Sequence, residues 1–458
     1  MCSVPHLESH NRLERLFPAT GGIRCCLFSP VGLLLLTLTL LMSGCQTYSP
    51  RALPETVQWS DELAVSERPL TLDEVVRLAL ANSPDVLRGK QDLAIASAKA
   101  YADGLPPDPT LSFSMDRPGA AGYIPGFMVG LSYEISALVA LPAKKRAAEA
   151  AIEKQQLALD WSKWQVANHA YALYVTHVGL ERVENEVSLL SAHQKDVAER
   201  MQAALGRGDV TRDVTVLAES AYRESVQQLD TLQQDHLKSG HELTRLLGLR
   251  PETQLTLVSL SDEPEGVPPE AVSRGLAELG QRRPDLLALR AAYVEQDERY
   301  REALLGQFPR LDIGVTRGRD TSHIYTSGLT VSVTLPLFNG NRGSIALEKA
   351  TRRSLYEEYT QRLRDAYAAV NGISSQLSLL DNQLRSARSL ETMLRASVTA
   401  ARSEHDAGDM TLPIFADLES RLLLQRIATA KLANAVFQQQ VELCTLIGVS
   451  AIDHQPLQ

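Results

Sequence analysis

Four short segments of the chain alternate apolar and polar residues with a period of two. Serine, threonine, glycine and acidic residues fill most positions between the apolar ones. This alternation is typical of a strand with one apolar and one polar face. It predicts two strands within about 109–136 and two within about 309–335. The apolar positions are Leu111, Phe113 and Met115; Phe127, Val129, Leu131, Tyr133 and Ile135; Leu311, Ile313 and Val315; and Leu329, Val331, Val333 and Leu335.

Two much longer segments carry a heptad pattern instead. Residues 143–205 contain no proline and one glycine, and residues 344–407 repeat this plan. Apolar residues at alternating spacings of four and three form the seam of a coiled coil. At 1.5 Å per residue, about 60 residues of helix extend roughly 90 Å, so each helix needs neighbours along its length. The seam positions are Val183, Val187, Leu190, Val197 and Met201 in the first segment, and Ile373, Leu377, Leu380, Leu384 and Ala387 in the second.

Each long helix is expected to end at a Gly-Asp turn. The turns are GDVT at 208–211 and GDMT at 408–411. Gly208 and Gly408 can adopt the left-handed conformation that ends a helix, and Thr211 is a candidate N-cap for the next helix. The second helices extend to about 247 and 447. The pattern therefore predicts two antiparallel helical hairpins, at about 143–248 and 343–448.

Several short motifs recur at an offset of 200 residues, which indicates an internal repeat. The expected copies are 70–250 and 271–450, joined by a linker at 251–270 that is rich in proline, glycine and acidic residues. An N-terminal arm at 45–69 precedes them and a tail at 451–458 follows. The matching pairs are Pro84-Asp85 with Pro284-Asp285, Pro109 with Pro309, Gly208-Asp209 with Gly408-Asp409, Glu219-Ser220 with Glu419-Ser420, and Gly248 with Gly448.

The first 44 residues have the plan of a lipoprotein signal peptide. Arg24 precedes a short leucine-rich core, and LMSGC at 41–45 resembles a lipobox. Removal of 1–44 would leave Cys45 as the lipidated N-terminus, and Cys444 as the one other cysteine. A membrane-anchor helix is the alternative, but Pro30 and the short apolar core fit a spanning helix poorly. No disulfide framework is expected.

Composition narrows the function classes. The net charge of −9 gives no basic stripe for nucleic acid. Aromatic residues make up 5% of the chain, which suits long helices rich in alanine and leucine. Neither a metal-ligand spacing nor a phosphate-binding or catalytic motif is found in the sequence, so we expect no cofactor and no enzyme activity.

Four strands with one apolar face would leave open edges and an uncovered surface in water. Their pattern suits lipid on one side and water on the other. Closed barrels generally need at least eight strands, so one chain cannot close a barrel, whereas three chains would supply twelve strands. A soluble sandwich joined to a coiled coil is the alternative, but it leaves the export signal and the duplication of strands and helices unexplained.

Three segments carry a resemblance to a known family. They read RRPDLLALRAA at 282–292, FPRLDIGVT at 308–316 and VTLPLFNGNRGSI at 333–345. Together with the duplicated turns, they resemble the outer-membrane factors of the TolC type, which are the exit ducts of tripartite efflux pumps. The resemblance extends from about 70 to 450. The first copy departs at one corner, where LVALPAKKRAA at 138–148 replaces a glycine-containing segment.

The resemblance implies a mixed α/β membrane protein that forms a homotrimer. Its four strands per chain would contribute to a twelve-stranded barrel in outer-membrane lipid, and its hairpins would form an α-helical barrel across the periplasm. Gly208, Asp209, Gly408 and Asp409 would then lie at the periplasmic tip and contact an adaptor protein. The helix after each turn would face the pore constriction, which makes Asp417, and less directly Asp213, candidate gate residues.

Simpler structural interpretations of these residues remain open. Both glycines are also ordinary helix stops, and Asp213 and Asp417 also suit the N-terminal part of a helix. A periplasmic adaptor is an alternative function, although it would need only one hairpin. The duct of a type I protein secretion system is another. The expected pump is of the resistance–nodulation–division (RND) type, with an ABC exporter as the runner-up, and the sequence does not identify the substrate.

Overall fold

A computed structural model of the chain describes residues 48–56, 68–119, 122–259 and 266–449. Contacts divide the chain into two compact units, Met1–Gln58 and Trp59–Gln458. The described part of the first unit, 48–56, is exposed and has no helix or strand. The predicted signal peptide 1–44, Cys45 and the tail 451–458 lie outside the described residues.

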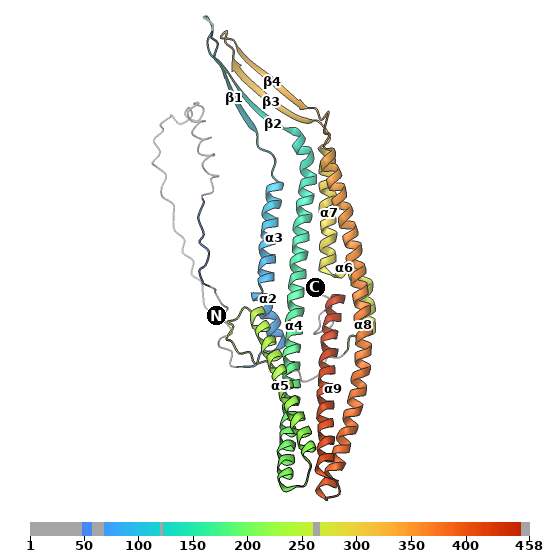
Figure 1. Cartoon of the computed structure of the whole chain (residues 1–458). Helices are drawn as coiled ribbons and strands as arrows, with labels where there is room; N and C mark the ends of the chain where they lie inside the picture. Colours follow the sequence, from blue (N-terminus) through green and yellow to red (C-terminus); the bar gives the residue numbers. More distant parts are fainter. Residues whose placement is uncertain (1–47, 57–67, 120–121, 260–265, 450–458) are drawn as a thin grey trace, which may run out of the picture. The chain divides into compact units, whose positions relative to one another are not determined.

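The second unit holds the helices and strands shown in Figure 1. Two short helices precede the first strand pair and two precede the second, and each strand pair is followed by a long helical hairpin. In chain order the elements are α2 (Leu72–Asn82), α3 (Pro84–Asp103), β1 (Thr110–Asp116), β2 (Gly126–Glu134), α4 (Ile135–Arg207), α5 (Arg212–Leu246), α6 (Pro269–Arg282), α7 (Pro284–Leu305), β3 (Arg310–Arg319), β4 (Tyr325–Thr334), α8 (Arg342–Asp406) and α9 (Leu412–Ile447).

The four strands form one antiparallel sheet in the order β1-β2-β3-β4. Leu131 lies opposite Leu111 on one side and Val315 on the other, and Val315 lies opposite Leu329. Because side chains alternate across a strand, this register gathers the apolar positions of all four strands on one face. All four of these residues are exposed. The strands predicted from the alternation are confirmed, and the outer edges of β1 and β4 have no partner strand among the described residues.

The two strand-to-helix corners differ. At the first, β2 passes directly into α4, which begins at Ile135 rather than near 143 and continues through Pro142. Pairing stops here because the N–H of Leu311 donates to Oγ of Ser136 instead of continuing the ladder. At the second corner, Gly340 and Asn341 have φ of 52° and 54°, and α8 begins only at Arg342. The first corner has no glycine to make that turn.

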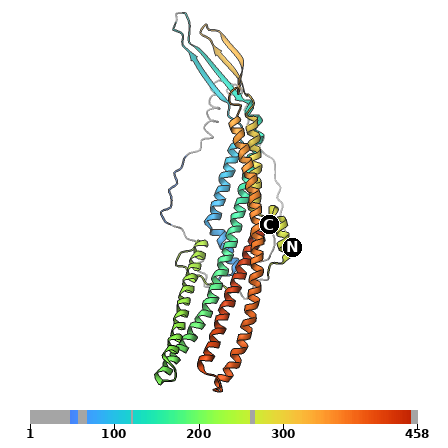
Figure 2. The ribbon, with the colours of Figure 1, turned by 45° about the vertical axis from the view of Figure 1, so that its right-hand side comes forward.

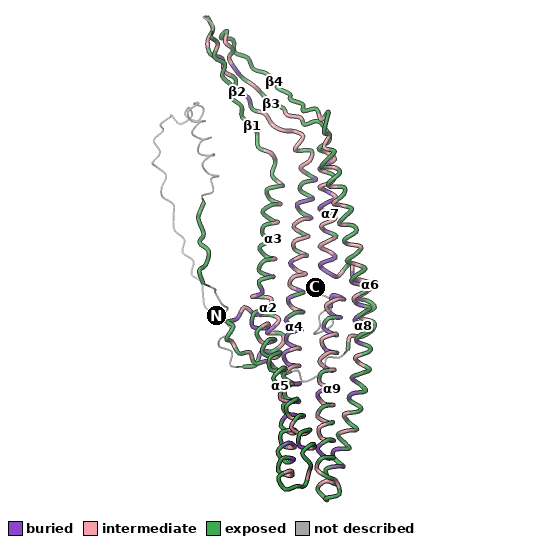
Figure 3. Tube along the Cα trace, viewed as in Figure 1, coloured by how far each residue is buried: buried purple, intermediate pink, exposed green. Residues whose placement is uncertain are grey.

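The long helices form two antiparallel pairs, α4 with α5 and α8 with α9. Figures 1 and 2 show the pairs side by side, joined where α4 contacts α9. Val183, Val187 and Leu190 of the first seam pack with side chains of α5 and α9. Ile373, Leu377 and Leu384 of the second seam pack with α9. Figure 3 shows the buried residues as a stripe along the helices rather than as one central core.

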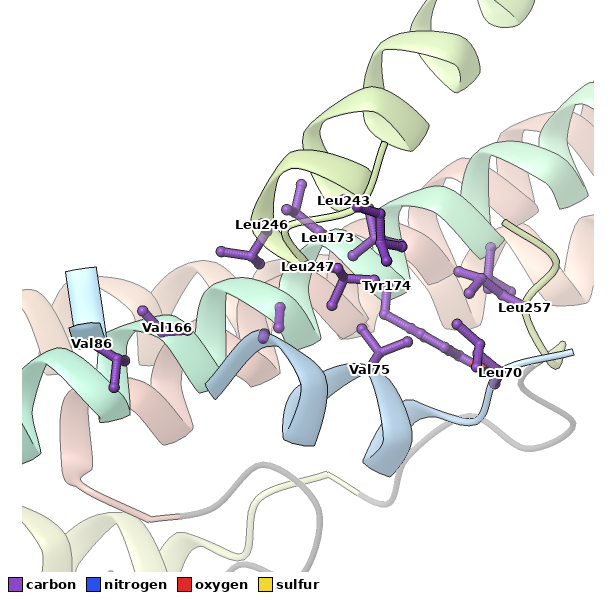
Figure 4. Close-up of a cluster of buried hydrophobic side chains, with 14 of the residues drawn as sticks. Leu70, Val75, Val86, Val166, Leu173, Tyr174, Leu243, Leu246, Leu247 and Leu257 are labelled. Atoms are coloured by element: carbon purple, nitrogen blue, oxygen red, sulfur yellow. Dashed lines mark hydrogen bonds between the residues drawn. The ribbon is translucent and has the colours of Figure 1, made fainter. Parts of the chain in front are cut away.

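The largest buried cluster joins α2, α4 and α5 (Figure 4). Tyr174 lies at its centre, and its hydroxyl donates to the carbonyl of Val258 at 2.5 Å. Leu70 and Leu257 form an isolated parallel bridge beside it. These contacts hold the segment after α5 against the start of the first repeat.

A buried ion pair lies between α6 and α7. The guanidinium of Arg283 donates to both carboxylate oxygens of Asp285, at 3.0 and 2.7 Å. Both side chains are 6% exposed. The Arg283 guanidinium also lies 5.2 Å from the centre of the Trp161 ring on α4, a cation–π distance. The RRPDL motif therefore has a structural role, because it ties α7 to α4.

None of the helices in the described residues combines the length and the apolar character that crossing a membrane requires.

Candidate functional site

Both hairpins turn at a glycine in the left-handed conformation. The φ angles are 81° at Gly208 and 85° at Gly408. The N–H of Asp209 donates to the carbonyl of Ala204, and that of Asp409 to the carbonyl of Glu404, each at 2.9 Å. These bonds close the last helical turn as in a glycine C-cap. A Cβ at either glycine would meet no atom within 4 Å, so the positive φ alone, and not crowding, selects glycine.

The helices after both turns begin without a threonine side-chain cap, although the sequence made Thr211 a candidate. Thr211 and Thr411 occupy the N-cap positions of α5 and α9, but neither side chain makes a capping hydrogen bond. The hydroxyl of Thr211 interacts with Asp213 instead. This contact, followed by the backbone N–H groups of Asp213 and Val214, lowers the pKa of the Asp213 carboxyl. Asp213 is therefore held as an anion at the helix start, which supports its simpler role there.

Only the second turn is braced by side chains. Nδ1 of His405 lies 3.0 Å from the carbonyl oxygen of Met410, on the other side of the turn. The His405 ring stacks on Phe415 at 4.9 Å, and the guanidinium of Arg402 lies 5.9 Å from the centre of the same Phe415 ring. The equivalent positions of the first turn carry Gln202, Leu205 and Thr215, which offer no such stack.

The tip carboxylates are exposed to solvent. Asp209 accepts a hydrogen bond from Nε of Arg207 at 2.8 Å, and this pair lies at the surface. Asp409 is also exposed and makes no ion pair within the described ranges. Both are accessible to a partner protein.

Asp417 lies one turn into α9, and its side chain is 60% exposed. Nε of Arg421 donates to its Oδ2 at 2.7 Å, one helical turn further on. Unlike Asp213, it is therefore not part of a cap. The structure places Asp209 and Asp213 at one hairpin turn, and Asp409 and Asp417 at the other.

Comparison with known proteins shows similarity to outer-membrane efflux proteins. The family model described as "Outer membrane efflux protein" matches residues 276–449. The chain is similar to the pyoverdine export outer membrane protein OpmQ of Pseudomonas putida, with 24% identity over 92% of this chain and 97% of that protein. The match to the outer-membrane efflux protein family therefore covers the second half of the chain, residues 276–449.

Solved structures share the fold of this chain over most of its length. The chain is similar to the CmeC outer membrane channel of Campylobacter jejuni, with a TM-score of 0.66 and 16% identity, over 87% of this chain and 94% of that one. It is also similar to the MtrE outer membrane channel of Neisseria gonorrhoeae in its open state. There the TM-score is 0.67 and the identity 14%, over 88% of this chain and 98% of that one.

Near Asp417, one ionic contact holds α8 to α9 within the second hairpin, and another joins the two hairpins through α4 and α9. Nη2 of Arg402 lies 2.6 Å from Glu419, and Nδ1 of His193 lies 3.6 Å from the same carboxylate. Further along α9, Nη2 of Arg426 lies 2.6 Å from Glu186 on α4. Sequence reasoning missed these contacts. The only signal was the match of Glu219 with Glu419, which marks the position but not its partners.

A histidine pair joins α4 to α5. The Nε2 atoms of His177 and His236 are 3.1 Å apart, and Nδ1 of His236 lies 2.9 Å from Glu184. Burial, and then the neighbouring His236, lower the pKa of His177 to about 4. His177 is therefore neutral at neutral pH. The described residues contain no group of three ligands that could hold a metal ion.

Proposed function

We propose that this efflux protein is the passive exit duct of a tripartite efflux system, working as a homotrimer. Small molecules or ions expelled by an inner-membrane pump would enter through a periplasmic adaptor and leave through the outer membrane. One observation carries the proposal. A single chain joins a four-stranded sheet with an exposed apolar face and unpaired edges to two long helical hairpins. Such a sheet is stable when further copies close it and lipid covers its apolar face.

The proposed role as an exit duct also implies a periplasmic adaptor and an inner-membrane pump as partners. An RND pump is the preferred partner, and an ABC exporter is the second candidate. The similar protein of Pseudomonas putida is a pyoverdine export protein, which makes a siderophore one candidate substrate. A duct takes its specificity mainly from its pump, so the geometry of this chain does not select a substrate. Lipidation of Cys45 would add a lipid anchor to the chain.

The function is tested with the full chain expressed in its native envelope. We expect trimers in the outer-membrane fraction that dissociate only on heating, and ion conductance when they are inserted into planar bilayers. A monomer in the periplasmic fraction that gives no conductance would favour the adaptor reading instead. Normal drug export after deletion of the gene would not decide the matter if a second duct is present, so conductance is the primary measurement.

Asp417 is proposed to line the pore constriction, with three copies per trimer. Asp417→Ala is expected to lower the cation-to-anion permeability ratio several-fold, because each subunit loses a carboxylate and keeps the cation of Arg421. Single-channel recording in a salt gradient measures the ratio. The matched control is Asp213→Ala, whose carboxylate belongs to a helix start and should leave selectivity unchanged. Unchanged selectivity in Asp417→Ala would remove this residue from the gate.

A further inference from the structure

An arginine interrupts the apolar face of the sheet. Arg317 on β3 lies opposite Val129 on β2 and Ser327 on β4, and Val315 precedes it on the same face. Its side chain is exposed. Among the residues that the structure describes, nothing pairs with its guanidinium by a hydrogen bond or an ion pair. A guanidinium in contact with lipid is costly unless it has a counter-charge or reaches the headgroup level.

Arg317 stands where the apolar residues of β3 and β4 end on this face. Towards the helices, β3 carries only apolar residues on this face. Leu329 on β4 is the last apolar residue opposite them, because it pairs with Val315, and the next residues of β4 on that face are Ser327 and Tyr325. Tyrosine is typical of the boundary between hydrocarbon and headgroups. On β3 and β4 the apolar face therefore ends at Arg317, whereas on β2 it continues with Val129 opposite Arg317 and Phe127 opposite Arg319.

A second guanidinium lies beside the first. Arg319 is the next β3 residue on this face, and its guanidinium lies 5.5 Å from the centre of the Phe127 ring. Its Nη2 donates to the carbonyl of Pro125 at 2.9 Å. Its Nε is buried and has no hydrogen-bond partner among the described residues. Arg319 is thus fixed by the protein, whereas Arg317 is free to bind.

The same face is hollowed into an open groove of about 720 Å³. Leu329 on its wall is 72% exposed. Arg317 lies between the level of Val315 and the level of Phe127 and Tyr325, and apolar side chains form most of the remaining lining. The lining side chains on this face are Phe127, Val129, Leu131, Val315, Arg317, Tyr325, Ser327 and Leu329.

We propose that this groove binds a phosphate-bearing acyl lipid of the surrounding membrane. An acyl chain lies along Val129, Val315 and Leu329, and the lipid phosphate pairs with Arg317, with Arg319 adding positive charge. The apolar lining of the groove selects a lipid over free phosphate, which would contact only the guanidinium. The inference rests on the proposed function, because it requires the apolar face to contact membrane lipid.

The test uses the full-length trimer in nanodiscs that contain equal amounts of phosphatidylglycerol and phosphatidylcholine. After extraction, native mass spectrometry counts the lipids that stay bound. We expect the wild type to retain phosphatidylglycerol several-fold over phosphatidylcholine, and Arg317→Gln to lose this preference. Because Arg317 has no protein partner, its replacement should not impair folding. Leu329→Ser should weaken retention of both lipids while keeping the charge.

Arg310→Gln is the matched control. Arg310 lies on the same strand but on the polar face, where its Nε is 3.3 Å from Glu134. Its variant should keep the wild-type lipid preference. Equal retention of phosphatidylglycerol by the wild type and Arg317→Gln would overturn the inference, as would displacement of the lipid by millimolar inorganic phosphate. If such trimers still conduct ions, the proposed duct function stands without the lipid site; if the wild type neither trimerises nor conducts, the function itself fails.

Discussion

Asp285→Ala is expected to lower the free energy of unfolding by about 3–5 kcal/mol, the usual effect of removing one partner of a buried ion pair. Asp285 is 6% exposed and binds the Arg283 guanidinium through both carboxylate oxygens. Without it, Arg283 keeps one backbone contact, to the carbonyl of Leu446 at 3.4 Å. Arg362 lies 3.8 Å from the same carboxylate, so the variant also leaves two cations close together.

The repeat supplies the control. Asp85 follows a proline at the equivalent position of the first copy, but its side chain is 66% exposed and lies 3.8 Å from Arg88. Residue 83 is a serine, whose Oγ accepts the N–H of Asp85 at 3.3 Å. Asp85→Ala should therefore cost no more than about 1 kcal/mol. Urea unfolding of the trimer in detergent, followed by helical circular dichroism, compares the two. Equal losses of unfolding free energy in the two variants would show that burial of the Arg283–Asp285 pair is unimportant.

The strands could be predicted because the side-chain period of two is a local property. Leu111, Leu131, Val315 and Leu329 come from four separate segments, yet each segment alone shows which face is apolar. The end of β2 could not be predicted in the same way. Apolar and polar residues continue to alternate to Ser136, but the ladder stops where Oγ of Ser136 takes the N–H of Leu311. That contact joins residues 175 positions apart and leaves no local pattern.

The features of the candidate site likewise fall into those that local sequence determines and those that contacts between helices determine. The left-handed glycines follow from residue identity, since few other residues accept a φ near 81° or 85°. The brace of His405 on Phe415 and the contact of His193 with Glu419 depend on which helix faces join, and heptad spacing does not specify this. Arg317 was visible as a break in the alternation. A charged residue near a strand end is common in any sheet. Only the strand register shows that Arg317 lies on the apolar face beside Val129.

Substitution of a turn glycine distinguishes a structural role from a contact with a partner protein. Gly408→Leu is expected to abolish efflux while trimers still form. A leucine at φ of 85° costs about 1–2 kcal/mol, and its Cβ would meet no atom within 4 Å, so the helices themselves are not pushed apart. The seam residues that hold α8 to α9, such as Leu384, lie well along the helices from the tip. What changes is the exposed surface at the turn, where the proposed adaptor contact lies.

Gly408→Asn is the matched variant, because asparagine tolerates the left-handed conformation and is smaller and polar. It should keep most of the efflux. Accumulation of a fluorescent pump substrate in cells measures efflux, and unheated gel electrophoresis of the same membranes measures the trimer. Loss of the trimer in Gly408→Leu would make the glycine a helix stop only. Normal efflux with an intact trimer would mean that no partner contacts this turn, and the first turn, which lacks the His405 brace, would then be the surface to examine at Gly208.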